Sequence, residues 1–324
     1  MEITKRKLKV FITVDTEVWE FYDDIEANIA SGFWGITKEG EFGLKYQLDL
    51  LAQYNLKATF FVDPFFSYHS GITPLETAIK CINLHKQEVG LHIHTEWLKG
   101  LENPPFQLGK IYGNIGDFDL DSQQLLIGDA LQILENIDDT KICSFRAGNY
   151  GANNDTLTVL NRLGITFDTT YNASYIGHPC NITTDSVISS PSLINDTIEI
   201  PVTQFIDYPN HRRHLQLGAC SFSEIKDVLE ANWQANQYSC VIVMHSFEWI
   251  KRKNKVHSLD HICKKRFLKL CEFLANNQDK CETAAFSDVD PKEATSPSES
   301  YIAKVKTSST LIRLYEQLLR KVLN

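Results

Sequence analysis

The sequence predicts an α/β fold in which a parallel sheet closes into a barrel of seven or eight β/α units. Seven short runs rich in β-branched and aromatic residues alternate with stretches of helical spacing, the pattern of parallel strands joined by crossover helices. The chain has 324 residues, a length at which a single closed barrel is usual. An open doubly wound sheet is the alternative, but no G-x-G-x-x-G follows the first predicted strand, so a dinucleotide-binding fold has no direct support.

The predicted strands are short apolar runs. The first covers residues 8–15, and the most strongly apolar one covers 239–245. The other five cover 57–63, 88–94, 141–147, 165–169 and 197–202. Because most of them are followed by a helix, we expect their carboxyl ends to lie at one edge of the sheet.

Apolar residues spaced three and four apart predict the helices between these strands. In the helix at 43–54, Leu44, Leu48 and Leu51 share one face. Gly164 is expected to end another helix as its C-cap. The other predicted helices cover 73–85, 121–136, 154–163, 223–236 and 259–275.

Composition and charge limit the classes of function. The net charge of −9 argues against a nucleic-acid partner, which would need a basic surface to neutralise phosphates. No apolar run reaches the ~18 residues of a membrane span, and the run after the basic first residues is too short for a signal peptide. We therefore predict a cytoplasmic protein whose eight cysteines, none in a CxxC pair, are free thiols.

The last part of the chain is expected to follow the barrel domain as a separate segment. Residues 1–287 form the predicted barrel domain, and the polar, Pro- and Ser-rich segment 288–300 is a predicted linker. Residues 301–324 are predicted to form a basic amphipathic helix, which either docks on the barrel or lies on an anionic membrane surface. Its apolar positions are Leu311, Leu314, Leu318 and Val322, and its basic residues are Lys304, Lys306, Arg313, Arg320 and Lys321, against a lone Glu316.

Titratable residues gather where four predicted strands end. Barrel enzymes carry their catalytic groups at this end of the strands, so side chains from different strands meet there. The residues are Asp15 and Glu17 at the first strand, His92, His94 and Glu96 at the third, Arg146 in the fourth and His245 in the seventh.

The spacing within this set is typical of a metal centre. His92 and His94 are two residues apart in a strand, so their side chains point to the same face, and the same holds for Asp15 and Glu17. Two imidazoles and a carboxylate suit Zn²⁺ or a similar divalent ion and leave a position for water. The second carboxylate would then act as a general base and His245 as a general acid.

Four segments resemble, in order, the motifs of the polysaccharide deacetylase family, the NodB-homology or carbohydrate esterase family 4 hydrolases. Residues 13–17 (TVDTE) are similar to the first motif, and 88–92 (EVGLH) lead to the family's metal histidine. The third and last motifs correspond to 145–151 (FRAGNYG) and 241–245 (VIVMH). The resemblance covers roughly residues 9–247 and implies a distorted (β/α) barrel of NodB-homology type.

The resemblance also implies roles for single residues. Asp15 would be the general base, and Arg146 would orient it. His245 would protonate the leaving amine, and the backbone N–H of Tyr150 would contribute to an oxyanion hole. The reaction implied is hydrolysis of an N-acyl, typically N-acetyl, group on a sugar.

The metal ligands implied by the resemblance are Glu17 and His92, with zinc as the expected ion and cobalt or nickel as alternatives. The family's second motif places another histidine four residues after the first, where this chain has Glu96. The third ligand is therefore either Glu96 or His94, and we favour His94 because strand geometry points it beside His92. Thr16 stands where many family members carry a metal-binding aspartate.

We therefore predict a metal-dependent hydrolase that removes an N-acyl group from a sugar in glycan or polysaccharide biosynthesis. For a cytoplasmic enzyme, a sugar on a lipid or nucleotide carrier is the accessible substrate. One alternative is a deformylase or another amidohydrolase on the same scaffold. The other is a non-catalytic glycan-binding homologue that has lost the metal, although such a module has no use for a base, an orienting arginine and an acid.

Overall fold

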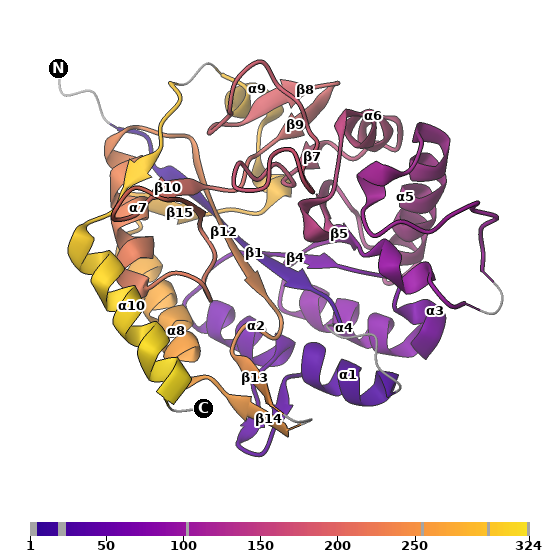
Figure 1. Cartoon of the computed structure of the whole chain (residues 1–324), viewed down its shortest axis with the longest axis horizontal. Coiled ribbons are helices and arrows are strands. Elements are labelled where there is room, and N and C mark those ends of the chain that lie inside the picture. The colour runs from indigo at the N-terminus through magenta and orange to yellow at the C-terminus, as the bar shows by residue number, and fades with distance from the viewer. Residues whose placement is uncertain (1–4, 19–23, 102–103, 254–255, 297–298, 323–324) are drawn as a thin grey trace.

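A curved, mostly parallel β-sheet forms the centre of the structure, and helices pack around its outer side (Figure 1). The structure is a computed structural model that describes the chain except residues 1–4, 19–23, 102–103, 254–255, 297–298 and 323–324. In order across the sheet, the strands are β12 (Ser239–His245), β1 (Leu8–Thr16), β4 (Thr59–Val62), β5 (Glu88–Ile93), β6 (Ser144–Ala147), β7 (Phe167–Asp168), β9 (Thr197–Glu199) and β8 (Ser192–Ile194), with β15 (Cys281–Thr283) beside the start of β1. Among the described strands of this sheet, β8 runs antiparallel to its neighbour β9, and all other neighbouring strands are parallel.

The sheet curls into a half-barrel, and an irregular segment completes the wall. Val243 of β12 exchanges backbone hydrogen bonds of 2.9 Å with Leu215 and Leu217. At the opposite end of the curved sheet, the Val202 N–H donates to the carbonyl oxygen of Tyr171, just beyond β7, at 3.0 Å. The predicted distorted α/β barrel is therefore confirmed, with one part of its wall made by loop backbone in place of a strand.

Helices cover the outer side of the sheet, because a connection between parallel strands must cross over one of its faces. Local signals fix several helix ends. Ser221 and Glu224 form a capping box at the start of α7 (Phe222–Gln234), and Gly164 follows α6 (Asn154–Arg162) with a φ of +80°, in the predicted C-terminal cap. The other helices are α1 (Ile25–Gly32), α2 (Leu44–Gln53), α3 (Ser67–Ser70), α4 (Thr73–Leu84), α5 (Leu120–Glu135), α8 (His261–Ala275), α9 (Pro291–Ala294) and α10 (Thr307–Val322), and short 3₁₀ helices cover Thr95–Leu98, Ile115–Asp117, Gly148–Tyr150 and Phe286–Asp288.

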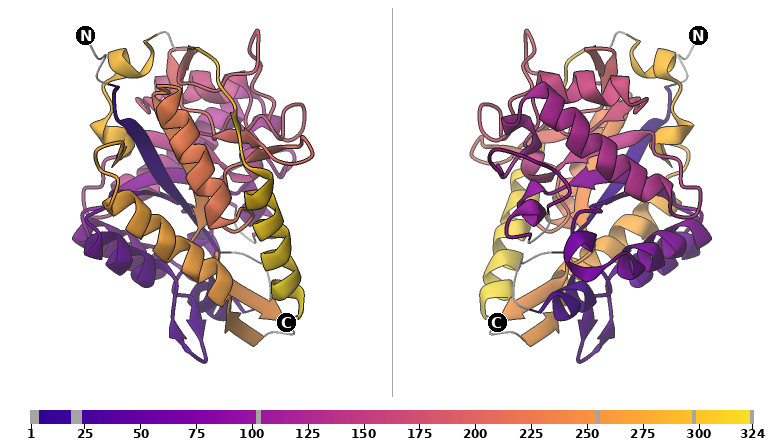
Figure 2. Two further views of the ribbon diagram at one scale, coloured as in Figure 1. Left: turned by 90° about the vertical axis from the view of Figure 1, so that its left-hand side faces the viewer. Right: turned by 90° about the vertical axis from the view of Figure 1, so that its right-hand side faces the viewer.

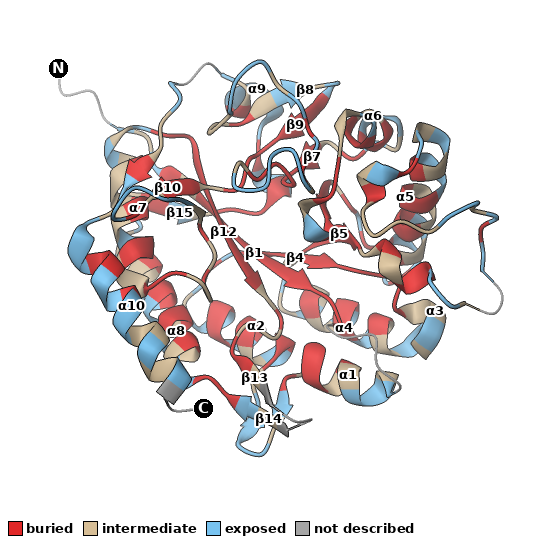
Figure 3. Ribbon diagram, in the orientation of Figure 1, coloured by how far each residue is buried: buried red, intermediate tan, exposed pale blue. Residues whose placement is uncertain are grey.

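Alternation along the strands separates two buried apolar layers. Ile12 of β1 belongs to the outer layer, between the sheet and the helices, whereas Phe11 belongs to the layer inside the barrel. Val243 of β12 also belongs to the inner layer, and Figure 3 shows that these central strands are buried along most of their length. Because alternate residues of a strand share a face, Asp15 and His245 continue the inner rows at the carboxyl ends of their strands.

Three small sheets lie outside the main one. β2 (Ile36–Thr37) pairs with β3 (Gly40–Glu41), β13 (Ile250–Lys253) pairs with β14 (Val256–Leu259), and β10 (Gln204–Ile206) lies between β11 (Arg212–His214) and β16 (Ala303–Lys304). The segment predicted as a linker, 288–300, contains the short helix α9. Strand β16 then returns the chain to the barrel, and α10 packs along α7. Within the described part of the chain, no helix is both long and apolar enough to cross a membrane.

Candidate metal centre and active site

Four strand ends meet at one mouth of the barrel. In the strand registers, Asp15 lies opposite His245, and His92 lies opposite Arg146. Arg146 is fully buried beside the cavity of about 370 Å³ that opens at this mouth. The cavity is lined by Asp15, Glu17, His92, His94, Tyr150 and His245, together with Ala147, Asn149, Tyr175, Pro179, His214 and Gln216. Of the eight residues singled out from the strand ends and the motifs, six line this cavity, Arg146 is buried beside it, and Glu96 is not among its lining residues.

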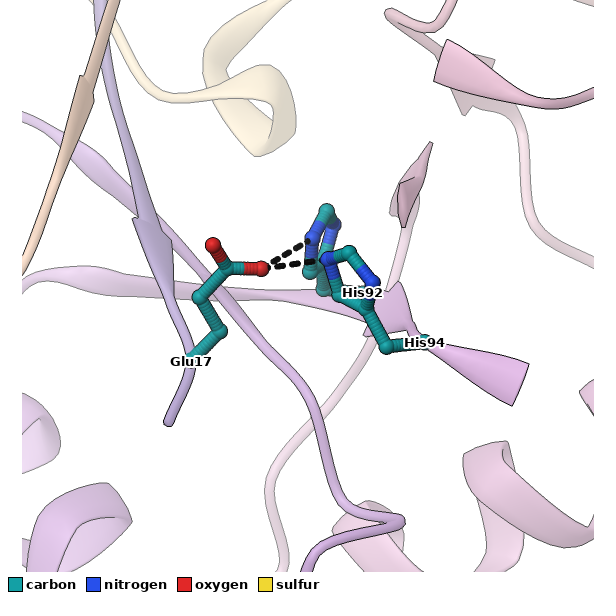
Figure 4. A group of neighbouring side chains, drawn as sticks. All are labelled: Glu17, His92 and His94. Atoms are coloured by element: carbon teal, nitrogen blue, oxygen red, sulfur yellow. Dashed lines mark hydrogen bonds and ion pairs between the residues drawn. The ribbon is translucent and has the colours of Figure 1, made fainter. Parts of the chain in front are cut away.

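Glu17, His92 and His94 form a compact group with metal-ligand chemistry (Figure 4). Glu17 Oε2 lies 3.2 Å from His92 Nε2 and 2.5 Å from His94 Nε2. One potential ligand atom from each side chain lies within 4.8 Å of the other two. Among the described residues, Glu96 is not part of this group, so the geometry favours His94 over Glu96 as a third ligand.

The outer nitrogens of both imidazoles lie near oxygen atoms, and their Nε2 atoms are directed at Glu17. His92 Nδ1 donates to the carbonyl oxygen of Arg146 at 2.7 Å, and His94 Nδ1 lies 3.4 Å from Glu96 Oε2. Asn149 holds the same Glu96 carboxylate at 2.9 Å. Such outer contacts fix the orientation of metal-bound histidines in proteins. The donor set therefore fits a divalent cation such as zinc.

The charge state of Glu17 agrees with cation binding. Burial acts to raise the pKa of this carboxyl group, but His94 and His92 outweigh that effect and hold its pKa well below the usual value. Glu17 is therefore ionised at neutral pH, which is the form that binds a metal.

Asp15 and Arg146 form a buried ion pair beneath the cavity. Arg146 Nη1 lies 2.7 Å from Asp15 Oδ1, and Arg146 Nε donates to the Thr169 carbonyl oxygen at 3.2 Å. The guanidinium carbon lies 4.7 Å from the ring centroid of Phe61, a cation–π distance. The arginine is held on three sides and fixes the position of the carboxylate in turn.

His245 is paired with a carboxylate that the motifs did not indicate. Its Nδ1 lies 2.7 Å from Glu248 Oε2, and its backbone N–H donates to the same oxygen at 2.8 Å. Burial acts to lower the pKa of His245, but Glu248, with smaller effects of Glu17 and Asp15, raises it to about 9. His245 is therefore protonated at neutral pH and has a proton to donate from Nε2, the nitrogen on the side of Glu17.

Gly218 makes room for Glu248. A Cβ atom at this position would lie 1.7 Å from Glu248 Oε1, so no other residue leaves the carboxylate in place. The sequence carries one weak signal for this arrangement, an acidic residue three positions after a histidine that ends a strand. The contact between Gly218 and Glu248 has no signal in the sequence, because the two lie 30 residues apart in the loops after different strands.

Sequence reasoning also missed Asp63 and Tyr175, and it singled out Tyr150 only for its backbone N–H. Asp63 follows β4 at the same barrel mouth, is fully buried, and its Oδ2 atom has no hydrogen-bond partner within the described structure. Burial raises its pKa to about 6, against opposing effects of the two site histidines. In the cavity wall, the Tyr150 and Tyr175 rings stack at 5.4 Å, and His214 lies against both.

The turn after β6 carries Asn149 and Tyr150 in an unusual backbone conformation. Their φ angles are +56° and +57°, in the left-handed region that residues other than glycine rarely occupy. Such conformations cluster at functional sites. This turn brings Tyr150 to the cavity wall, next to the cavity-lining Asn149.

Comparison with known proteins gives a similarity of structure only. No protein-family model and no curated protein sequence matches the chain. A putative polysaccharide deacetylase from Mycobacterium smegmatis has a similar structure, with a TM-score of 0.56 and 14% sequence identity over 93% of this chain and 96% of that one. The fold is therefore that of a polysaccharide deacetylase, which confirms the fold that the four motifs implied.

Two further solved structures match with TM-scores below 0.5. One is the Bc1960 peptidoglycan N-acetylglucosamine deacetylase, with a TM-score of 0.45 and 14% identity over 91% of this chain and 92% of that one. The other is BA3943 from Bacillus anthracis, a CE4 family pseudoenzyme, with a TM-score of 0.41 and 11% identity over 88% of this chain and 66% of that one.

Proposed function

We propose that this chain is a metal-dependent hydrolase that removes an N-acyl group, most simply an N-acetyl group, from a sugar in glycan biosynthesis. The observation that carries the proposal is the meeting of three different parts in one cavity. These are the Glu17–His92–His94 group, the Asp15–Arg146 pair and the His245–Glu248 pair. A ligand group, a held carboxylate and a protonated histidine are together the parts that amide hydrolysis needs.

The proposed mechanism divides proton transfer between two side chains. A divalent cation held by the ligand group would polarise the acyl carbonyl and activate water for attack at neutral pH. Asp15, held by Arg146, accepts the proton of the attacking water. His245 donates its proton to the sugar nitrogen as the C–N bond breaks, so the products are a carboxylic acid and an amino sugar. The backbone N–H of Tyr150 is proposed to stabilise the negative oxygen formed on the acyl carbon.

The choice of metal follows from the ligands. Two imidazole nitrogens and one carboxylate oxygen suit zinc, and cobalt or nickel fit the same set. Thr16 contributes no ligand, because its hydroxyl donates to the Val14 carbonyl oxygen in its own strand at 3.1 Å. Glu17 is the ligand that we propose in place of the family's aspartate.

The proposed substrate is a carbohydrate, and a sugar on a lipid or nucleotide carrier suits a cytoplasmic enzyme. The Tyr150–Tyr175 pair offers aromatic surface beside the catalytic groups, where a sugar ring can stack. All of the site residues fall within 1–287, which we propose as the catalytic domain, followed by a linker at 288–300. The C-terminal segment 301–324 is proposed as a peripheral membrane contact; its predicted helix begins only at Thr307, because β16 (Ala303–Lys304) precedes α10.

A measurement of product release tests this function. The purified, zinc-loaded chain would be incubated with N-acetylated and N-formylated amino sugars, free and linked to nucleotide or lipid carriers, and released acetate or formate would be measured. We expect acetate release that is lost in Asp15→Asn. Formate but no acetate would favour the deformylase alternative. Binding of a glycan without release of either acid would favour the non-catalytic alternative.

A further inference from the structure

Helix α10 is docked on the protein through its polar side. Arg313 Nη2 lies 2.5 Å from Asp207 Oδ2, and Arg313 Nε lies 2.9 Å from Glu224 Oε1. All three residues are buried. Two buried carboxylates, from residues outside the helix, thus pair with one arginine in the first half of α10.

The second half of α10 is held in the same way. Arg320 Nε lies 2.5 Å from Asp260 Oδ2, and Glu316 Oε2 lies 2.7 Å from Arg266 Nη2 of α8. Arg320 also donates to the Gly218 carbonyl oxygen at 3.0 Å. Ion pairs at three successive turns therefore fix which side of the helix faces the protein.

The opposite side of α10 is apolar and faces solvent. We define the apolar stripe of α10 as Leu311, Ile312, Leu314, Tyr315 and Leu318, whose exposed fractions are 56%, 42%, 48%, 66% and 64%. Figure 2 shows the helix at the edge of the molecule, and Figure 3 shows much of its outer side exposed. This is the reverse of an ordinary surface helix, which buries its apolar side and exposes its polar side. A contiguous exposed apolar surface of this kind marks an interaction site.

Exposed basic side chains lie on the C-terminal segment and on the neighbouring helix α8. Lys304 and Lys321 are exposed at the two ends of the C-terminal segment, and Lys265 and Lys269 are exposed on α8, the helix that Arg266 joins to α10. None of these four lysines forms an ion pair with another described residue. The acidic residue of α10, Glu316, is already paired with the protein. The C-terminal segment and the helix beside it thus carry exposed positive charges outside any described ion pair, although the whole chain has a net charge of −9.

We propose that α10 docks this protein on an anionic lipid surface, with the apolar stripe among the headgroups and Lys265, Lys269, Lys304 and Lys321 near the lipid phosphates. A helix that places an apolar side in the interface and basic residues beside it binds such surfaces both by burying apolar area and by electrostatic attraction to the anionic lipids. A second copy of the chain fits less well, because a two-fold contact through the stripe would bring two sets of unpaired lysines together. The proposal gives residues and lipid chemistry to the peripheral contact named under the proposed function, and it does not depend on the hydrolase activity.

Vesicle binding by the full-length chain tests this inference. Co-sedimentation would be measured with vesicles of phosphatidylcholine alone and of phosphatidylcholine with 30 mol% phosphatidylglycerol. We expect binding to the anionic vesicles that weakens as salt is raised. The double variant Leu311→Gln/Leu318→Gln should weaken it by roughly tenfold or more, and Lys265→Glu/Lys269→Glu by roughly fivefold per lysine.

A matched control separates the stripe from general surface hydrophobicity. Leu84 and Leu193 are 81% and 60% exposed on other parts of the molecule, so Leu84→Gln/Leu193→Gln should leave vesicle binding unchanged. Equal loss in this control, or no binding of the folded wild-type chain to anionic vesicles, would overturn the proposal. The proposal would also be overturned if the wild-type chain bound no vesicles but formed a dimer in sedimentation velocity, and if Leu311→Gln/Leu318→Gln converted that dimer to a monomer. The stripe would then be a contact between copies of the chain. Acetate release by a chain that does not bind vesicles would reject this inference alone and leave the proposed function standing.

Discussion

Arg146 Nη1 lies 2.7 Å from Asp15 Oδ1, and both side chains are buried. The carbonyl oxygen of the same arginine accepts a hydrogen bond from His92 Nδ1 at 2.7 Å. One residue of β6 therefore holds the proposed general base with its side chain and a proposed metal ligand with its backbone. This double contact explains why base and ligand can keep a fixed distance although they belong to different strands.

Asp15→Asn should abolish catalysis without removing the metal. Asparagine keeps an oxygen that accepts from Arg146, but it cannot take a proton from water. We expect kcat to fall by roughly 100- to 10,000-fold, the usual contribution of a general base. Metal content and the circular dichroism spectrum should match the wild type. Normal turnover in this variant would reject Asp15 as the base.

His94→Ala and Glu96→Gln should have different effects on metal binding. His94 belongs to the ligand group, whereas Glu96 lies outside that group, beside the Nδ1 atom of His94. We expect His94→Ala to lose stoichiometric zinc, and Glu96→Gln to keep it with an affinity about 10- to 100-fold weaker. Zinc titration calorimetry measures both values. The reverse result, with zinc retained in His94→Ala and lost in Glu96→Gln, would assign the third ligand to Glu96.

The alkaline limit of activity should depend on Glu248. His245 must be protonated to act as an acid, and its pKa is raised to about 9, so kcat/KM should fall as the pH rises through about 9. Glu248→Gln removes the main cause of the raised pKa, and we expect the alkaline limb to move to lower pH. A pH profile of kcat/KM for both proteins checks this shift. An unmoved limb would mean that another group sets it.

The same pair predicts how stability depends on pH. The folded pKa of His245 lies above its unfolded value of about 6.5, so the stabilisation from the pair is complete below that pH and is lost as the pH rises through about 9. Gly218→Ala should weaken it, because the added methyl group displaces Glu248. Urea unfolding at pH 7 and pH 10 should show a larger difference between the two pH values for the wild type than for Gly218→Ala. If the unfolding free energy changed equally between the two pH values in both proteins, Glu248 would not be the group that stabilises protonated His245.

Arg313→Met should destabilise the fold. Methionine keeps much of the side-chain volume but leaves Asp207 and Glu224 buried without their cation, which costs about 3–5 kcal/mol of unfolding free energy. Arg212→Met, at an exposed position of β11, is the control and should change stability by no more than about 0.5 kcal/mol. Urea denaturation measures both. A small effect of Arg313→Met would mean that α10 is held by its other contacts.

The strand-end residues could be predicted because their positions depend only on local periodicity. Alternation along β1 and β12 places Asp15 and His245 inside the barrel mouth without any knowledge of which strands pair. His92 and His94 follow from the same rule. The proposed metal ligands, Asp15 and His245 therefore line one cavity, and Arg146 is buried beside it.

What the sequence could not predict depends on contacts between distant segments. Glu248 reaches His245 because Gly218, in another loop, has no side chain. The loop wall of the barrel and the pairing of β16 with β10 also depend on segments far apart in the sequence. The amphipathic tail was predicted as a helix, but its inverted orientation follows from carboxylates such as Asp207 that lie about 100 residues earlier in the chain.

Calorimetric titration of the purified, chelator-treated chain with zinc tests whether Glu17, His92 and His94 hold a metal ion. We predict one tightly bound ion per chain, lost in His92→Ala and retained in His85→Ala, a change to a half-buried histidine on the outside of the barrel. A wild-type chain that binds no zinc, or a His92→Ala chain that binds as much zinc as the wild type, would show that Glu17, His92 and His94 do not form a metal centre.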